Sequence, residues 1–289
     1  YTVFGRVTPE QKRMFVKALK RHGKTVGMTG DGVNDILALR DADCSVAMAS
    51  GSEAASNAAQ LVLMDSDFSR MPSVVAEGRR VVNNIERAAI LYLTKNIFSL
   101  LLAVFSVVNV LSYPLTPSQI TLISMFTIGV PSFIISLEPN RDLIKGTFLG
   151  NVFKTAAPAG ITTFISVSSL VVFGEVFAID AECISTSSTM LVALVGFMIL
   201  AKVAKPSNMF HIGLVAVCVA GMGYCVFFMP EMFGINSIST QAAMLLAVFL
   251  IATEAVFRYI YKFVGLFSLI GTGRKKRRGR KKSRRRSAA

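Results

Sequence analysis

The stretch Thr29-Gly30-Asp31-Gly32-Val33-Asn34-Asp35 follows an apolar run at 25–28 and precedes a helical pattern that begins near Asn34. This order predicts a buried strand, a tight glycine turn and a helix. The carboxylates of Asp31 and Asp35 can converge on a hard cation, and the Asn34 amide can orient a phosphate or its bound water. Mg²⁺ prefers oxygen ligands of this kind and is typically held by one or two carboxylates plus phosphate. The alternative is that both aspartates only cap the helix.

A second motif, Arg6-Val7-Thr8-Pro9-Glu10-Gln11-Lys12, lies upstream of the first. Residues 3–6 are predicted to form a strand. Thr8 is predicted to cap a helix, with Pro9 at its first position and Gln11 completing a capping box, which places Lys12 in the first turn. Together the two motifs resemble the phosphorylation domain of P-type ATPases, which belong to the haloacid-dehalogenase-like superfamily.

This resemblance implies a role for each motif residue. Lys12 neutralises the transferred phosphoryl group, Asp31 and Asp35 hold Mg²⁺, and Asn34 completes the loop. Phosphoryl transfer requires mainly positioning and charge stabilisation, which one ammonium group and one Mg²⁺ ion supply. The implied cofactors are ATP and Mg²⁺. The implied catalytic residues are Lys12, Asp31, Asn34 and Asp35, and the implied cofactor-binding residues are Lys12, Thr29, Gly30, Asp31 and Asn34.

Further apolar runs at 45–48 and 61–64 alternate with helical stretches, which is typical of a parallel α/β sheet covered on both faces. We expect residues 1–71 to form part of an α/β Rossmann-like domain of the haloacid-dehalogenase-like type, with catalytic groups at strand ends. The family's Asp-Lys-Thr-Gly-Thr nucleophile sequence and Thr-Gly-Glu loop do not occur in the chain. The resemblance therefore implies a C-terminal fragment, inactive alone, whose partners are the actuator domain, the nucleotide-binding domain and the first four membrane helices of the same polypeptide.

The composition is that of a membrane protein, with 53% hydrophobic residues, 17% charged residues and a mean hydropathy of +0.56. We predict an all-α bundle of six transmembrane helices over 89–265, at 89–111, 115–137, 153–174, 187–204, 211–229 and 240–262. The connections that hold Arg141, Lys145 and Lys205 mark the cytoplasmic side, since the other loops have no Lys or Arg. Both ends of the chain are expected in the cytoplasm and the bundle in the plasma membrane. Within the family, six such helices indicate the ten-helix branches.

Residues 72–88 are predicted to be a connecting helix. Pro72 can begin a helix after Ser69, and the next proline is Pro114, so one helix of about 40 residues is possible. The alternative is two helices with a hinge near 83–84. The basic side chains of this region are interpreted as a solvated or headgroup-facing surface: Arg79, Arg80 and Arg87.

Most of the net charge of +14 comes from residues 274–286, which hold eleven Lys or Arg. A segment this charged is predicted not to fold by itself, and 266–289 is expected to be a basic cytosolic tail that attracts anionic lipid headgroups. Nucleic acid is not expected as a partner at a bilayer surface. The alternative is a topology anchor without a regulatory role.

Polar side chains inside the predicted spans are candidates for a transport site, because they are expensive in a bilayer. The resemblance to cation pumps implicates Lys95, Asn96, Ser99, Ser124, Thr127 and Glu254. The sequence Gly129-Val130-Pro131 is predicted to interrupt the second span and free carbonyl groups for an ion. Three alternatives stay open: the hydroxyls only bond between helices, Lys95 snorkels to the interface, and Glu254 faces Arg258.

The sequence as a whole predicts ATP-driven cation transport through an aspartyl phosphate formed upstream of these residues. Calcium is the first choice, because the Thr-Pro-Glu-Gln-Lys motif and the stretch 132–140 most resemble bacterial pumps linked to calcium. Ser99 stands where calcium and sodium/potassium pumps have a carboxylate, which argues against calcium. One alternative is a phospholipid flippase of the same superfamily, and another is a non-catalytic membrane receptor or channel with a phosphatase-like domain. The four cysteines form no Cys-x-x-Cys pair, so a thiol metal site is not predicted.

Overall fold

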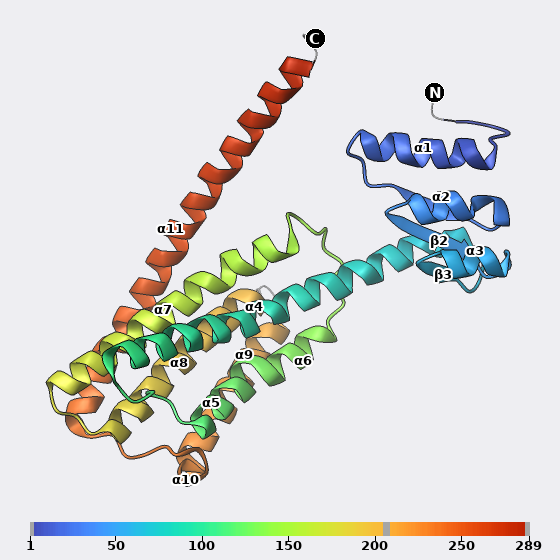
Figure 1. Cartoon of the computed structure of the whole chain (residues 1–289). Helices are drawn as coiled ribbons and strands as arrows, with labels where there is room; N and C mark the ends of the chain where they lie inside the picture. The colour runs from blue at the N-terminus through green and yellow to red at the C-terminus, as the bar shows by residue number, and fades with distance from the viewer. Residues whose placement is uncertain (1–2, 205–208, 287–289) are drawn as a thin grey trace. The chain divides into compact units, whose positions relative to one another are not determined.

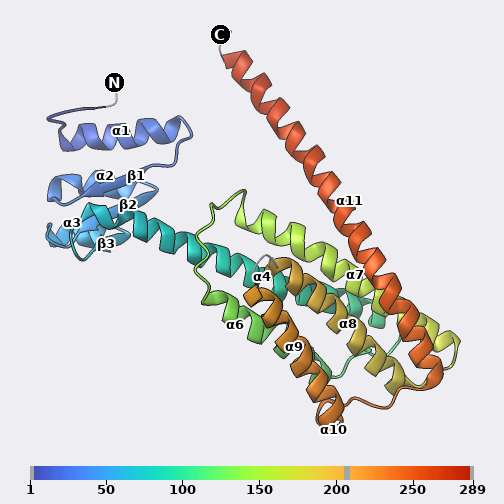
Figure 2. The same cartoon turned by 180° about the vertical axis from the view of Figure 1, so that it is seen from behind.

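The computed structural model describes residues 3–204 and 209–286, with side chains described through residue 264. The chain divides into two compact units, Tyr1–Gly78 and Arg79–Ala289. Figure 1 and Figure 2 show the elements of each unit from opposite sides. The first unit combines a small sheet with helices, and the second is helical.

The first unit is built on a parallel sheet of three strands in the order β1 (Gly27–Gly30), β2 (Cys44–Met48) and β3 (Leu61–Leu63). Two short helices, α2 (Ile36–Asp41) and α3 (Glu53–Ala58), connect consecutive strands, as parallel pairing requires a crossover. The register pairs Met28 with Ser45 and Ala47 with Val62. The three predicted strands after residue 24 are thus confirmed, although β1 begins at Gly27 rather than at residue 25.

The first helix, α1 (Pro9–Arg21), begins as predicted. Thr8 caps it, Pro9 occupies the first turn and the side chain of Gln11 completes the capping box. The strand predicted at 3–6 is wrong: these residues form no regular element, and Arg6 has a positive φ of 49°. A strand needs a neighbour to pair with, and within the described residues the sheet contains only β1, β2 and β3.

One continuous helix, α4 (Met71–Asn109), has 39 residues. It follows a short 3₁₀ turn, η2 (Phe68–Arg70). Pro72 lies in its first turn, where the missing N–H removes no intrahelical bond. Of the two alternatives for this region, the single helix is observed, and no hinge interrupts it at 83–84. The division between the two units falls inside it, after Gly78.

The second unit contains the predicted six spans. Among the described residues, six helical segments are long and apolar enough to cross a membrane. The second of them is broken into α5 (Pro117–Ser124), a π-helical turn η3 (Met125–Gly129) and α6 (Val130–Ser136). The others are α4, α7 (Phe148–Val176), α8 (Ala181–Ala204), α9 (Met209–Phe228) and α11 (Thr240–Arg286), with the short α10 (Pro230–Phe233) after α9.

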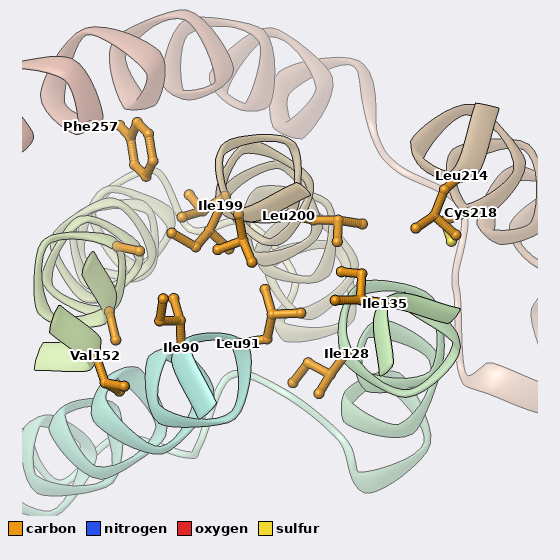
Figure 3. Packing of buried hydrophobic residues seen from close by; sticks show 14 residues of the cluster. Ile90, Leu91, Ile128, Ile135, Val152, Ile199, Leu200, Leu214, Cys218 and Phe257 are labelled. Atoms are coloured by element: carbon orange, nitrogen blue, oxygen red, sulfur yellow. The ribbon is translucent and has the colours of Figure 1, made fainter. Parts of the chain in front are cut away.

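The bundle packs around apolar side chains from several helices. Figure 3 shows this cluster, in which Ile90 and Leu91 of α4 lie near Ile199 of α8. Ile128 of η3 and Ile135 of α6 belong to the same cluster. Close packing of this kind holds membrane helices together, because lipid chains are as apolar as these side chains and burial alone provides little driving force.

The helix α11 continues through the basic segment to Arg286, whereas the sequence predicted only that this segment would not fold by itself. The two statements are compatible for a physical reason. A helix that is already nucleated adds one hydrogen bond for each residue fixed, and Lys and Arg are good helix formers. The prediction treated the segment as an isolated peptide, in which nucleation would be costly.

Candidate functional site

The loop after β1 carries Asp31 at the carboxyl end of a parallel strand, where sites of α/β sheets usually lie. The side chain of Asp31 is exposed, and no hydrogen bond or ion pair joins this side chain to another described residue. The backbone oxygen of Asp31 accepts a hydrogen bond from the amide of Ser52 at 2.7 Å. The loop after β2 therefore fixes the backbone of Asp31 and leaves its carboxylate available to a cation.

Lys12 and Asp35 form the central contact of this site. The Nζ atom of Lys12 lies 2.7 Å from Oδ1 of Asp35, and their side chains are 37% and 7% exposed. Asp35 lies in the 3₁₀ turn η1 (Val33–Asp35), which opens α2. A buried carboxylate needs a charged or hydrogen-bonding partner, and Lys12 provides both. The contact brings together two predicted catalytic residues that are 23 positions apart.

Two basic side chains of α1 hold that helix against the end of α2 and the residues that follow it. The Nε atom of Arg13 lies 2.5 Å from Oδ2 of Asp41, and Nζ of Lys20 lies 3.0 Å from Oδ1 of Asp43. The hydrogen bond from Arg13 keeps the pKa of Asp41 below its ordinary value of 3.8. The amide of Val26, and then Lys20, likewise lower the pKa of Asp43. These contacts fix the position of the helix that carries Lys12.

Two glycines allow close approach around the loop. A Cβ atom at Gly30 would lie 2.6 Å from Cβ of Asp35. A Cβ atom at Gly51 would lie 2.2 Å from the backbone oxygen of Asp31. Such distances are too short for any larger residue without a backbone shift. The loop geometry therefore depends on both glycines.

The described residues fit Mg²⁺ in the manner typical of phosphate chemistry. No group of three or more His, Cys, Asp or Glu side chains gathers among them, so they form no all-protein metal cage. Mg²⁺ usually keeps several waters and binds one or two carboxylates plus phosphate. Asp31 fits such a role, and Asp35, whose Oδ1 atom holds Lys12, stays a predicted second ligand. Thr29 and Asn34 are exposed beside Asp31 in sequence, and their predicted roles stay predictions.

A second candidate site lies inside the helical unit, in a cavity of about 20 Å³. Residues from α4, α5, η3, α7 and α8 line it. Three of the predicted transport residues are among them: Lys95, Ser124 and Thr127. A cavity of this size holds about one water molecule.

The π-helical turn η3 lies directly at this cavity. Thr127 lines it and donates its hydroxyl to the carbonyl of Ile123 at 2.7 Å. Pro131 has no N–H, so the carbonyl of Thr127 cannot receive the usual α-helical hydrogen bond. The Oγ atom of Ser124 is buried without a hydrogen-bond partner among the described residues. The π-helical turn confirms that the regular α-helix of this span is interrupted, whereas carbonyl groups freed for an ion stay a prediction.

The other predicted transport residues do not line the cavity. Asn96 is exposed on α4. Ser99 forms a hydrogen bond with the hydroxyl of Tyr113 at 3.1 Å. Glu254 is exposed and forms an ion pair with Arg258, one turn further along α11. This last arrangement is the interfacial alternative that the sequence left open.

Two residues at the cavity were not predicted. Thr163 and Gly196 line it together with Thr94, which belongs to the polar cluster around Lys95 in the sequence. A Cβ atom at Gly196 would lie 2.7 Å from Cγ2 of Thr127, so this glycine permits the close approach of α8. No sequence pattern links Thr163 and Gly196 to Lys95, because the three residues lie on different helices that meet only in the folded bundle.

Arg87 corrects another interpretation. It was expected at a solvated or headgroup-facing surface, but it is buried and forms an ion pair with Glu138. The Nε2 atom of the buried His211 lies 3.2 Å from the same carboxylate. Asn84 donates hydrogen bonds to the carbonyls of Ser136 and Glu138. These contacts join α4 to the end of α6 and to α9.

Comparison with curated proteins found relatives that are longer than this chain. No family model matches the chain. The chain is 41% identical over 242 residues to "Calcium-transporting ATPase CtpE" of Mycobacterium bovis, covering 79% of this chain and 30% of that protein. It is 44% identical over 229 residues to the protein of the same name from Mycolicibacterium smegmatis, covering 74% and 29%. It is 38% identical over 255 residues to "Probable cation-transporting ATPase exp7" of Streptococcus pneumoniae, covering 86% and 33%. The chain thus spans about a third of the length of these relatives.

Proposed function

The chain belongs to the P-type cation-transporting ATPases, and we propose that the whole protein uses ATP and Mg²⁺ to move a cation across a membrane through an aspartyl phosphate. One observation carries the proposal. The ammonium group of Lys12 lies against buried Asp35, on the loop that exposes the carboxylate of Asp31. Lys12 of α1 offers a cation for phosphate, and the loop offers the carboxylate of Asp31 for a metal ion; phosphoryl transfer requires both charges.

The residues of the loop have separate tasks in this proposal. An ammonium group has three donors, and the bond to Asp35 uses one of them, which leaves two for phosphoryl oxygens. Asp35 holds Lys12 in position and is also proposed as a second ligand of Mg²⁺. Bound Mg²⁺ would supply charge stabilisation at the phosphate oxygens. Asn34 orients the phosphate or its water, and the acceptor aspartate lies in another part of the polypeptide.

The cation is proposed to pass through the cavity lined by Lys95, Ser124 and Thr127. Calcium is the first choice, because relatives at about 40% identity are named calcium-transporting ATPases. The ion would bind the Oγ atom of Ser124, which has no hydrogen-bond partner among the described residues, and the carbonyl oxygen of Thr127. The relatives named calcium-transporting and cation-transporting ATPases favour a cation over the phospholipid-flippase alternative. The receptor or channel alternative is disfavoured by the intact pairing of Lys12 with Asp35.

The chain is a multi-pass membrane protein. We propose the plasma membrane as its location, with both ends of the chain in the cytoplasm. The basic residues of the connection after α6, Arg141 and Lys145, support this orientation, because loops rich in Lys and Arg stay on the cytoplasmic side.

The proposal can be tested with the full-length protein in sealed vesicles. ATP hydrolysis and ion uptake are measured with a panel of divalent and monovalent cations and, separately, with a panel of lipids. We expect stimulation by calcium, and an acid-stable phosphoenzyme whose formation is lost in Asp31→Ala. Stimulation by lipids alone would contradict cation transport. Absence of a phosphoenzyme under every condition would favour the receptor or channel.

A further inference from the structure

A cleft of about 870 Å³ opens in the helical unit, and we call it the α4–α7 cleft. Its walls come from α4, from the segment 140–145, from the first turns of α7 and from the last turn of α8. Because α7 begins at Phe148 and α8 ends at Ala204, the cleft lies where membrane spans end. This is the level at which lipid headgroups meet a membrane protein.

Cationic side chains predominate in the α4–α7 cleft. Arg141 and Lys145 are exposed, and no hydrogen bond or ion pair joins their side chains to another described residue. The ammonium group of Lys202 lies 3.3 Å from the ring centroid of Tyr261, a contact that holds it in place without neutralising its charge. The carboxylate of Glu86 accepts a hydrogen bond from Asn151. The charged groups of the lining are four cations, of which Arg87 is already ion-paired with Glu138, and two carboxylates: Arg87, Arg141, Lys145, Lys202, Glu86 and Asp142.

An apolar pair lies between two of the cations. Leu143 and Ile144 line the cleft and are 65% and 43% exposed, although they follow Arg141 and precede Lys145. A short segment with cations on both sides of exposed apolar side chains is typical of the membrane interface, where the apolar groups enter the acyl layer and the cations stay at the headgroups.

We propose that the α4–α7 cleft binds the phosphate group of an anionic phospholipid. Arg141, Lys145 and Lys202 would donate hydrogen bonds to the phosphate, and Leu143 and Ile144 would contact the acyl chains. Free phosphate shares the first of these interactions but not the second. The position at the end of the spans and the exposed apolar pair favour the lipid. This inference concerns binding and does not rest on the proposed transport activity.

The first test measures lipid retention by the full-length protein in detergent, using native mass spectrometry with phosphatidylglycerol and phosphatidylcholine. We expect preferential retention of phosphatidylglycerol, which falls about tenfold or more in Arg141→Gln/Lys145→Gln, since each basic residue near an anionic surface contributes appreciably. The matched control is Arg284→Gln/Arg285→Gln, which removes the same charge from the basic segment. It should change retention less than twofold. Equal loss in both variants, or no preference in the unaltered protein, overturns the proposal. Size-exclusion chromatography verifies that each variant is folded.

The second test separates lipid from free phosphate. Inorganic phosphate at millimolar concentration is added to the protein with bound phosphatidylglycerol, and Leu143→Ser/Ile144→Ser is compared with the unaltered chain. We expect phosphate to displace little lipid and the apolar variant to lose retention several-fold. Complete displacement by phosphate, together with unchanged retention in the apolar variant, would assign the cleft to free phosphate and overturn the lipid proposal.

Discussion

Replacing Asp35 by Asn tests the contact at the centre of the phosphate site. Asn has nearly the same shape and still offers an oxygen to Lys12, so the variant removes charge with little change in volume. Asp35 is 5% exposed, and its Oδ1 atom lies 2.7 Å from Nζ of Lys12. We expect the ammonium group to lose its fixed position while α2 stays folded.

The size of the effect follows from the burial of the two partners. A hydrogen bond between charged groups contributes about 1.5–3 kcal/mol. Because the side chain of Lys12 is 37% exposed, solvent screens the pair and the lower end, about 1.5 kcal/mol, applies. A loss of that size reduces the population of the positioned ammonium group roughly tenfold. Phosphoenzyme formation should slow by at least the same factor.

The assay is rapid-quench phosphorylation of the full-length protein by labelled ATP in membrane vesicles. Asp67→Asn is the matched control, because Asp67 is an exposed carboxylate that bonds to Ser69 in another loop. It should leave the rate within twofold of the unaltered protein. If Asp35→Asn is equally fast, the positioning role of Asp35 is refuted.

Three further predictions concern other parts of the structure. Gly51→Ala should lower phosphoenzyme formation at least tenfold, because its Cβ atom would lie 2.2 Å from the backbone oxygen of Asp31; an unchanged rate would contradict this. The lowered pKa of Asp41 means that its ion pair stabilises the fold above pH 3.8 and that this contribution disappears as pH falls through the lowered value. The difference in unfolding free energy between the unaltered protein and Asp41→Asn, measured with urea, should therefore shrink below pH 3.8, and a constant difference would refute the ion pair. Gly196→Ala should fill the membrane cavity and weaken cation stimulation of ATP hydrolysis at least tenfold, whereas Gly213→Ala, which meets nothing within 4 Å, should not; equal effects would argue against the cavity.

The sequence predicted the first unit well wherever the signal was local. The capping box of Thr8 and Gln11 depends on neighbouring residues only, and the apolar runs that became β2 and β3 also have each other as partners in the sheet. The false strand at 3–6 failed because a strand exists only beside a partner, which the local pattern does not contain.

The candidate sites show the same limit. The two motifs contained Lys12 and Asp35, but no pattern shows that a lysine on α1 reaches the carboxylate on η1. In the bundle, hydropathy found the six spans, since each signal extends over about 20 residues. It could not choose between Lys95 and Asn96, because neighbouring residues on a helix point in directions 100° apart and only packing decides which one faces a cavity. Arg87 was misplaced for a similar reason, since its partner Glu138 lies 51 residues away.

The charges at the membrane cavity constrain the proposed calcium transport. Lys95 is partly buried at this cavity, to which the described residues contribute hydroxyl and apolar groups but no carboxylate. Ca²⁺ takes six to eight oxygen ligands and usually includes carboxylates among them. Hydroxyl and carbonyl oxygens carry no net charge, so they cannot offset a divalent ion beside an ammonium group in a medium of low dielectric constant. Calcium therefore requires carboxylates from parts of the whole protein outside these 289 residues. A full-length sequence without a carboxylate in its other membrane helices would contradict calcium and favour a monovalent ion.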